Sequence, residues 1–190
     1  MKKIVIFLLL LMALGGCSSI SPSSEKIWEH VKKYEGTKLV KEPNGYYSKY
    51  GLSTPRIRDY NKKYKKSYKV QHLTESQAKV IYDSLYYKNY EIYKIKNDRV
   101  KLAVVDTIYN QGTAGIKIIQ ETVNSLSSRR HRIKVDGRFG NETIGRINRI
   151  SHYKFLRTLR TKRIAYYRTR PHFRKYGRGW IRRVDDVTRT

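Results

Sequence analysis

The stretch that decides the fold runs Tyr34-Glu35-Gly36-Thr37-Lys38-Leu39-Val40-Lys41-Glu42-Pro43-Asn44-Gly45-Tyr46-Tyr47-Ser48-Lys49-Tyr50-Gly51-Leu52. Its first residues end a predicted helix, and its second half, rich in glycine and tyrosine, has the composition of a tight hairpin. The acid at the end of the helix is Glu35. A carboxyl group that faces a small aromatic hairpin is a common arrangement for protonating a glycosidic oxygen, so this stretch is the candidate catalytic centre.

The helix before the hairpin is predicted over residues 23–36, with Ser23 or Ser24 as its cap. Ile27, Val31 and Glu35 are spaced four apart, so they share one helical face. Glu35 therefore continues an apolar stripe, and a carboxyl group in that position can hold a proton near neutral pH, as a general acid must. The alternative is a structural glutamate bonded to a lysine or a backbone amide.

The chain opens with a leader of the kind that directs export. Met1-Lys2-Lys3 precedes an apolar run from Ile4 to Leu14, and Gly15-Gly16-Cys17 follows, which is the pattern of a secretory signal that ends in a lipobox. We expect a lipoprotein signal peptide over residues 1–16, lipidation of Cys17 and a tether over residues 17–23. Cys17 is the only cysteine, so no internal disulfide is expected. The alternative is an ordinary signal peptide with an incidental cysteine.

The formal net charge of +27 indicates an anionic partner. Tyrosines interleaved with lysines and arginines suit nucleic acid, but an exported lipoprotein rarely meets it. We therefore expect peptidoglycan as a partner, the membrane as a second one through Cys17, and no nucleic acid. The expected location is the cell envelope, on the periplasmic side of the outer membrane in a bacterium with two membranes, and the expected state is a monomer. The alternative is a merely solvated basic surface.

Caps and apolar spacing predict a mainly α protein. Helices are expected at residues 54–65, from residue 74 to about 90, at 97–112, from 113 onward, at 141–148 and at 151–168. The helix at 97–112 is the most apolar and is predicted to be central, so its polar Asp106 and Asn110 need partners or a ligand. The five histidines are scattered, and we expect no metal and no cofactor.

Six short motifs follow one another along the chain. They are Glu35-Gly36, then Gly45-x-x-Ser48-x-x-Gly51-Leu52, Leu73-Thr74-x-x-Gln77-Ala78, Asp106-x-x-x-Asn110-x-Gly112, Asp136-Gly137-x-x-Gly140-x-x-Thr143 and Gly179-Trp180-x-x-Arg183. In this order they resemble glycoside hydrolase family 108, the secretion-activator-like N-acetylmuramidases, with the peptidoglycan-binding segment that usually follows. The resemblance implies a lysozyme-like, mainly helical fold with a small β-hairpin next to the catalytic glutamate. It also implies a catalytic region over residues 24–112 and a helical peptidoglycan-binding-like segment over residues 113–190, packed on it.

The resemblance further implies that Glu35 is the catalytic acid and that Ser48 positions water. Asn44 stands nine residues after Glu35, where some related phage-type lysozymes carry a second carboxylate, and Glu42 offers a substitute for it. Thr37 replaces the second glycine of the family motif. The candidate substrate contacts are Asn44, Tyr47, Tyr50, Asp106, Asn110 and Trp180.

The implied protein is a lipid-anchored peptidoglycan hydrolase of the lysozyme type, which cleaves the β-1,4 bond between N-acetylmuramic acid and N-acetylglucosamine. The alternative is a non-catalytic peptidoglycan-binding lipoprotein that uses the same groove.

Overall fold

The computed structural model describes residues 22–189 and the side chains from Ser24 onward. The fold is mainly helical, as expected. Its elements are α1 (Pro22–Glu35), β1 (Val40–Lys41), β2 (Tyr47–Lys49), β3 (Leu52–Ser53), α2 (Thr54–Tyr64), α3 (Glu75–Tyr82), α4 (Asp98–Ser125), α5 (Asn141–Ile147), α6 (His152–Arg168) and α7 (Phe173–Thr188). Short helical turns at Val70–His72, Asp83–Lys88, Ile92–Lys94 and Arg129–His131 connect them.

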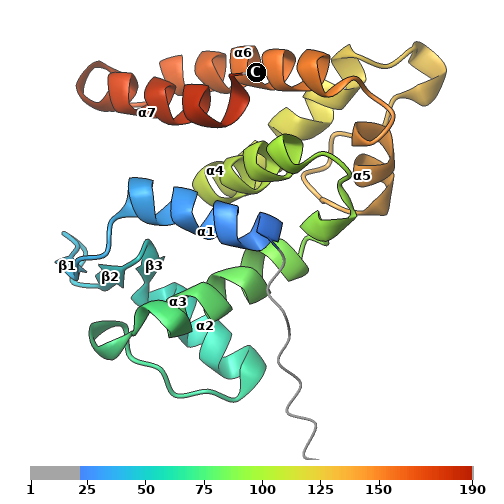
Figure 1. Ribbon diagram of the computed structural model, residues 1–190. Coiled ribbons are helices and arrows are strands. Elements are labelled where there is room, and N and C mark those ends of the chain that lie inside the picture. The colour runs from blue at the N-terminus through green and yellow to red at the C-terminus, as the bar shows by residue number, and fades with distance from the viewer. Residues whose placement is uncertain (1–21, 190) are drawn as a thin grey trace, which may run out of the picture.

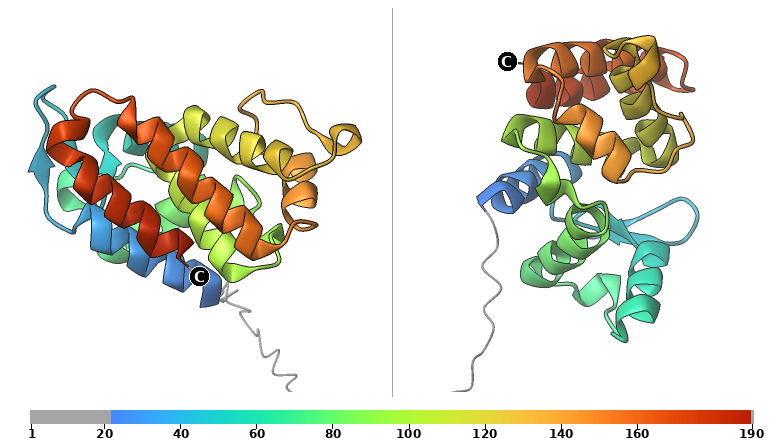
Figure 2. Two further views of the ribbon diagram at one scale, coloured as in Figure 1. Left: turned by 90° about the horizontal axis from the view of Figure 1, so that it is seen from above. Right: turned by 90° about the vertical axis from the view of Figure 1, so that its right-hand side faces the viewer.

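The long helix α4 lies at the centre of the molecule (Figure 1). α6 and α7 pack side by side against it on one side, and α1 packs against it on the other. α2, α3 and the sheet lie beyond α1, so the elements form three levels, which Figure 2 shows from two further directions. The first and last helices thus both contact α4.

α4 is central because its first half is apolar on most faces. Val100, Ala103 and Val104 are among its buried side chains. At Gly112 the backbone leaves helical geometry, with φ 54° and ψ −133°, a region that favours glycine. The helix boundary predicted at this glycine is therefore a kink within one helical run.

α1 buries the predicted stripe, since Ile27 and Val31 are both buried. The expectation that Ser23 or Ser24 caps the helix is wrong, because the helix begins at Pro22. The hydroxyl of Ser24 instead donates to Asp83 Oδ1 at 2.9 Å. This bond ties the start of α1 to the segment after α3.

The predicted hairpin is the first of two that form an antiparallel sheet in the order β1-β2-β3. Ser48 lies on the central strand, opposite Val40 on one side and Ser53 on the other. Tyr50 and Gly51 turn the second hairpin, with φ values of 54° and 70°. That turn points the chain back toward the end of α1.

No separate helix was predicted over the segment that forms the last helix, α7, in which Gly177 and Gly179 weaken helical propensity by about 1 kcal/mol each. Its apolar face compensates for them. Val184 packs with Ile164 and Tyr167 of α6 in a second apolar cluster. The pairing of α6 with α7 therefore closes the fold.

No helix in the described part of the chain is both long enough and apolar enough to cross a membrane. The predicted signal peptide and Cys17 lie outside the described residues.

Candidate active site

Glu35 is the last residue of α1, and its side chain points at the second turn of the sheet. The side chain is 23% exposed. A Cβ atom added at Gly51 would lie 2.7 Å from Glu35 Cγ and 2.9 Å from Glu35 Oε2. Only a residue without a side chain fits between this turn and the carboxyl group. The structure therefore brings the hairpin against Glu35, through Gly51.

Tyr109 of α4 holds that turn in place. Its hydroxyl donates a hydrogen bond to the carbonyl oxygen of Gly51 at 2.7 Å, and its ring packs against Tyr82 and Tyr86. Burial, and then the nearby Glu35 carboxylate, raise the pKa of Tyr109 well above its usual range. The phenol therefore stays protonated and remains a donor to the turn.

Arg183 of α7 reaches Glu35 from the other side. Its Nη1 donates to Glu35 Oε1 at 2.5 Å, and its Nε donates to Asp106 Oδ1 at 2.7 Å. The guanidinium also lies 5.1 Å from the centre of the Tyr34 ring. One planar group thus bridges the ends of α1 and α7 and the middle of α4, and it fixes one oxygen of Glu35.

Asp106 is the buried centre of this network, with a side chain only 1% exposed. Besides Arg183, it accepts from Arg163 Nη2 at 2.8 Å and lies 3.1 Å from His30 Nε2. Burial alone would raise the pKa of Asp106, but Arg163, His30 and Arg183 together hold it well below its usual range. Asp106 was expected to contact substrate. Because it is buried and bonded to Arg163, Arg183 and His30, it instead holds Arg183, which contacts Glu35.

Asn110 lies one turn of α4 after Asp106 and faces the same guanidinium. With its amide oxygen turned toward Arg183, it accepts from Nε at 2.6 Å and from Nη2 at 2.8 Å. Asn110 is exposed. Of the two polar residues predicted on this helix, it is the one that solvent reaches.

Ser48 forms a second polar pair on the hairpin. Its hydroxyl donates to Glu42 Oε1 at 2.6 Å, and both side chains are partly exposed. Asn44, at the tip of the first turn, accepts from the backbone N–H of Tyr46 at 3.1 Å. In this structure Asn44 therefore stabilises the turn, whereas Glu42 is the carboxylate beside Ser48.

The three aromatic residues predicted as sugar contacts are in different environments. Tyr47 is half-buried on β2. Tyr50 is 8% exposed and packs against Trp28 with ring centres 6.0 Å apart, so it belongs to the core. Trp180 is half-buried on α7 and stacks on Tyr167 at 5.1 Å. Tyr47 is therefore the one that is both partly accessible and on the same strand as Ser48.

Core residues cover the ring of Tyr50, so in this structure the ring presents no free face to a sugar. Sequence reasoning also gave no role to Arg183, Tyr109 or Arg163. Arg183 belongs to one of the six sequence motifs, but the motif does not indicate its partner. The packing of α7 places it in contact with Glu35. No three His, Cys, Asp or Glu side chains lie close enough to hold a metal ion in the described part of the chain.

Comparison with known proteins relates the segment that contains this site to a family of glycosidases. Residues 28–112 match the family model described as Glycosyl hydrolase 108. The structure of Brucella abortus SagA is similar to this one, with a TM-score of 0.69 and 21% sequence identity over 87% of this chain and 91% of that chain. At this identity the likeness shows a shared fold. No curated protein matches the chain. The matched segment contains Glu35, the hairpin and the first half of α4, and over these residues the chain is similar to the glycosyl hydrolase 108 family of glycosidases.

Proposed function

We propose that this protein is a peptidoglycan hydrolase of the muramidase type, with Glu35 as its general acid. The observation that carries the proposal is the position of Glu35, partly exposed, against the Gly51 turn and fixed by Arg183. The family match supports a glycosidase. The proposal goes beyond that match in three respects, which are the substrate peptidoglycan, the bond that is cleaved and the role of Glu35.

In the proposed reaction, Glu35 protonates the oxygen of the β-1,4 bond between N-acetylmuramic acid and N-acetylglucosamine. Oε1 accepts from Arg183, so the proton is carried on Oε2. The bond from the anomeric carbon to the glycosidic oxygen then breaks, and the proton of Glu35 leaves with the departing sugar.

We assign the attacking water to Glu42 and Ser48. The hydroxyl of Ser48 donates to Glu42, and a water beside the pair can give its proton to the carboxylate as its oxygen bonds to the anomeric carbon. Asn44 cannot act as this base because an amide accepts no proton near neutral pH. Tyr47 and Asn110, both on accessible parts of the site, are proposed sugar contacts. Trp180 is a more peripheral one.

A second candidate function is non-catalytic binding of peptidoglycan at the same site. The observation in its favour is that Asn44, and not an acid, occupies the tip of the hairpin. The experiment compares purified wild-type protein with Glu35→Gln on isolated peptidoglycan. A muramidase clears the suspension only as wild type. A binding protein sediments with the wall in both forms and clears it in neither.

We also propose that residues 113–190 form the peptidoglycan-binding part of one catalytic unit with residues 24–112. Helix α4 crosses the boundary between the two segments, and Arg183 from the second reaches Glu35 in the first. Under this proposal, the first segment expressed alone lacks the arginine that orients its acid.

The leader pattern supports a further proposal, that the protein is exported and anchored in the cell envelope as a monomeric lipoprotein through Cys17. Labelling with a radioactive fatty acid tests this. Label on the wild-type protein and none on Cys17→Ser is the expected result, and equal labelling of the two would contradict it.

A further inference from the structure

The C-terminal helices carry the most one-sided charge in the chain. Residues 143–184 contain fourteen lysines and arginines and no acid. Two of these cations, Arg163 and Arg183, are used internally, since both pair with Asp106. The others lie mainly on the outer surface of α6 and α7, where a charge of one sign attracts an anionic ligand.

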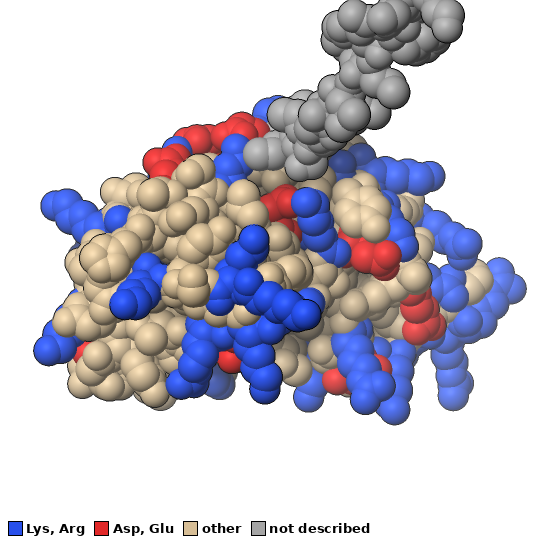
Figure 3. All heavy atoms as spheres, turned by 90° about the horizontal axis from the view of Figure 1, so that it is seen from below, with Lys and Arg blue, Asp and Glu red and all other residues tan. Residues whose placement is uncertain are grey.

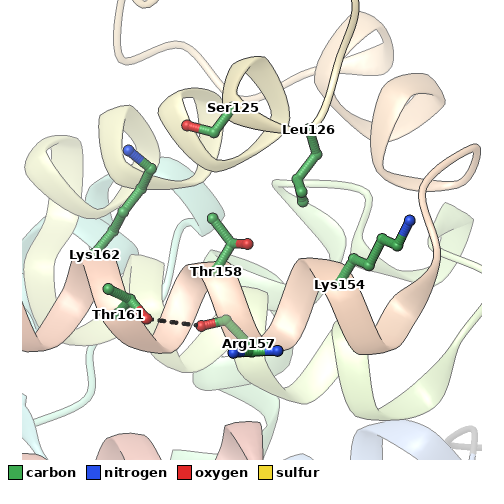
Figure 4. Close-up of a pocket in the computed structure, with 7 residues that line it drawn as sticks. All are labelled: Ser125, Leu126, Lys154, Arg157, Thr158, Thr161 and Lys162. Atoms are coloured by element: carbon green, nitrogen blue, oxygen red, sulfur yellow. Dashed lines mark hydrogen bonds between the residues drawn. The ribbon is translucent and has the colours of Figure 1, made fainter.

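Part of this surface is hollowed rather than flat. A pocket of about 480 Å³ lies between the end of α4 and the outer face of α6 (Figure 4). Its lining residues, which we call the α6 pocket, are Ser125, Leu126, Lys154, Arg157, Thr158, Thr161 and Lys162. In Figure 4 the side chains of Lys154 and Lys162 extend from α6 on either side of Thr158, and Ser125 and Leu126 lie across from them at the end of α4.

The three cations of the α6 pocket are available to a ligand. Lys154, Arg157 and Lys162 form no ion pair with any described residue, whereas most of the acids near the surface are already paired with other lysines and arginines. Like charges on successive turns of one helix repel each other. An anion bound among them would relieve that repulsion.

A second hollow of about 480 Å³ lies on the other side of the same helix. Its lining residues are Tyr153, Lys154, Arg157, Arg160, Thr188 and Arg189. Lys154 and Arg157 line both hollows, so a strip of positive charge crosses α6 from one to the other. Arg160 and Arg189 are partly neutralised by Asp185, which leaves the two shared cations and Lys162 as the main attraction.

The lining chemistry suits phosphate better than carboxylate alone. A guanidinium fork and ammonium groups bind phosphate oxygens strongly. Thr158 adds a hydroxyl donor beside them, whereas the hydroxyls of Ser125 and Thr161 already donate to backbone carbonyl oxygens. The apolar Leu126 and the exposed Tyr153 give contact surface for uncharged linking groups. Two adjoining hollows with shared cations accommodate successive phosphates along one chain.

We propose that the α6 pocket and the adjoining hollow bind a phosphodiester-bearing anionic polymer, laid across α6. None of the residues in either hollow contacts Glu35 through any described bond, so the polymer and the glycan would occupy different sites. Such a site would hold the enzyme beside its substrate wherever the two polymers occur together.

The opposite face of the molecule provides the control. Seen from below in Figure 3, its lysines and arginines are spread out and mixed with acids. Lys62, Lys66 and Lys69, in and after α2, are exposed and form no ion pair with a described residue. Replacing these three by glutamine removes as much charge as replacing the three cations of the α6 pocket.

The test measures binding of synthetic poly(glycerol phosphate) to full-length protein by calorimetry at fixed salt. The triple variant Lys154→Gln, Arg157→Gln and Lys162→Gln should bind about tenfold more weakly than wild type, as expected for three partly exposed ion pairs. The triple variant Lys62→Gln, Lys66→Gln and Lys69→Gln should lose no more than about twofold. Glu35→Gln should bind like wild type, so this result is independent of the proposed muramidase activity.

Three outcomes would overturn the proposal. Equal losses in the two triple variants would mean that only the overall charge attracts the polymer. Binding of monomeric glycerol phosphate as tight as that of the polymer would exclude a site that spans α6. Binding of phosphatidylglycerol vesicles that depends on the α6 pocket, without binding of the polymer, would make the ligand a membrane.

Discussion

Arg183 Nη1 lies 2.5 Å from Glu35 Oε1, although 148 residues of sequence separate the two. The same guanidinium lies 2.7 Å from Asp106 Oδ1. A single side chain from the last helix thus connects the candidate acid to a buried carboxylate on the central helix. The C-terminal helices are therefore part of the site, although the matched family segment ends at residue 112.

Arg183→Lys should lower peptidoglycan hydrolysis by about 10- to 100-fold, because a misplaced catalytic group costs rates of this order. Lysine keeps the charge but cannot bridge Glu35 and Asp106 with one planar group. The matched control is Arg182→Lys, an exposed neighbour, which should retain wild-type activity. Both variants should be folded by circular dichroism. Full activity in Arg183→Lys would mean that Glu35 needs no such orientation.

Gly51→Ala should abolish most activity and destabilise the protein. A Cβ atom there would collide with the hydroxyl of Tyr109 and crowd the carboxyl group of Glu35. The positive φ adds strain of about 1–2 kcal/mol. Gly45→Ala is the control, since it has a similar φ of 82° but no atom within 4 Å of the added carbon. Gly45→Ala should unfold at a lower temperature than wild type and keep its activity. Equal activity in Gly51→Ala and Gly45→Ala would argue against a close approach at Gly51.

Glu42→Gln should reduce turnover by about 10²- to 10⁴-fold, the usual contribution of a general base, while binding to the wall is unchanged. Ser48→Ala should have a smaller effect in the same direction, because it removes the donor that orients Glu42. Glu121→Gln, an exposed acid on α4, controls for loss of one negative charge. Unchanged turnover in Glu42→Gln would assign the water to another group.

The Asp106 network should make stability depend on pH in the acid range. The pKa of Asp106 is lower in the folded protein than its unfolded value of about 3.9. Its contribution is therefore complete above that value and is lost as the pH falls toward the folded pKa. Asp106→Asn should be less stable near neutral pH and should lose less stability than wild type between about pH 4 and pH 2. The loss of stability is measured as the melting temperature of each protein over this pH range, with the exposed Asp59→Asn as control. Parallel curves of melting temperature against pH for Asp106→Asn and wild type would contradict the assignment.

Local patterns in the sequence predicted the parts of the fold that local interactions determine. The four-residue spacing of Ile27, Val31 and Glu35 placed the acid at the end of a helix. A helix was expected to end at Gly112 because glycine commonly follows the last helical residue. The residue does adopt a positive φ of 54°, but the chain resumes the same helical run after it. The identity of the residues next to Glu35 depends on tertiary packing, which spacing along the chain does not determine.

Asp106 illustrates why the rest could not be predicted. A polar residue on an apolar helix must find partners, and sequence alone did not distinguish a ligand from a protein cation. Its two arginine partners, Arg163 and Arg183, reach it from helices that follow much later in the chain. No separate helix was predicted over α7, which its apolar contacts with α6 stabilise despite its two glycines.

The decisive measurement is the release of new reducing ends from purified peptidoglycan by wild type and by Glu35→Gln, with mass spectrometry of the products. We predict that wild type generates fragments that end in N-acetylmuramic acid, and that Glu35→Gln binds the wall but generates none. Release of such fragments by both proteins would remove Glu35 from the chemistry, and their absence with both would leave a wall-binding protein without muramidase activity.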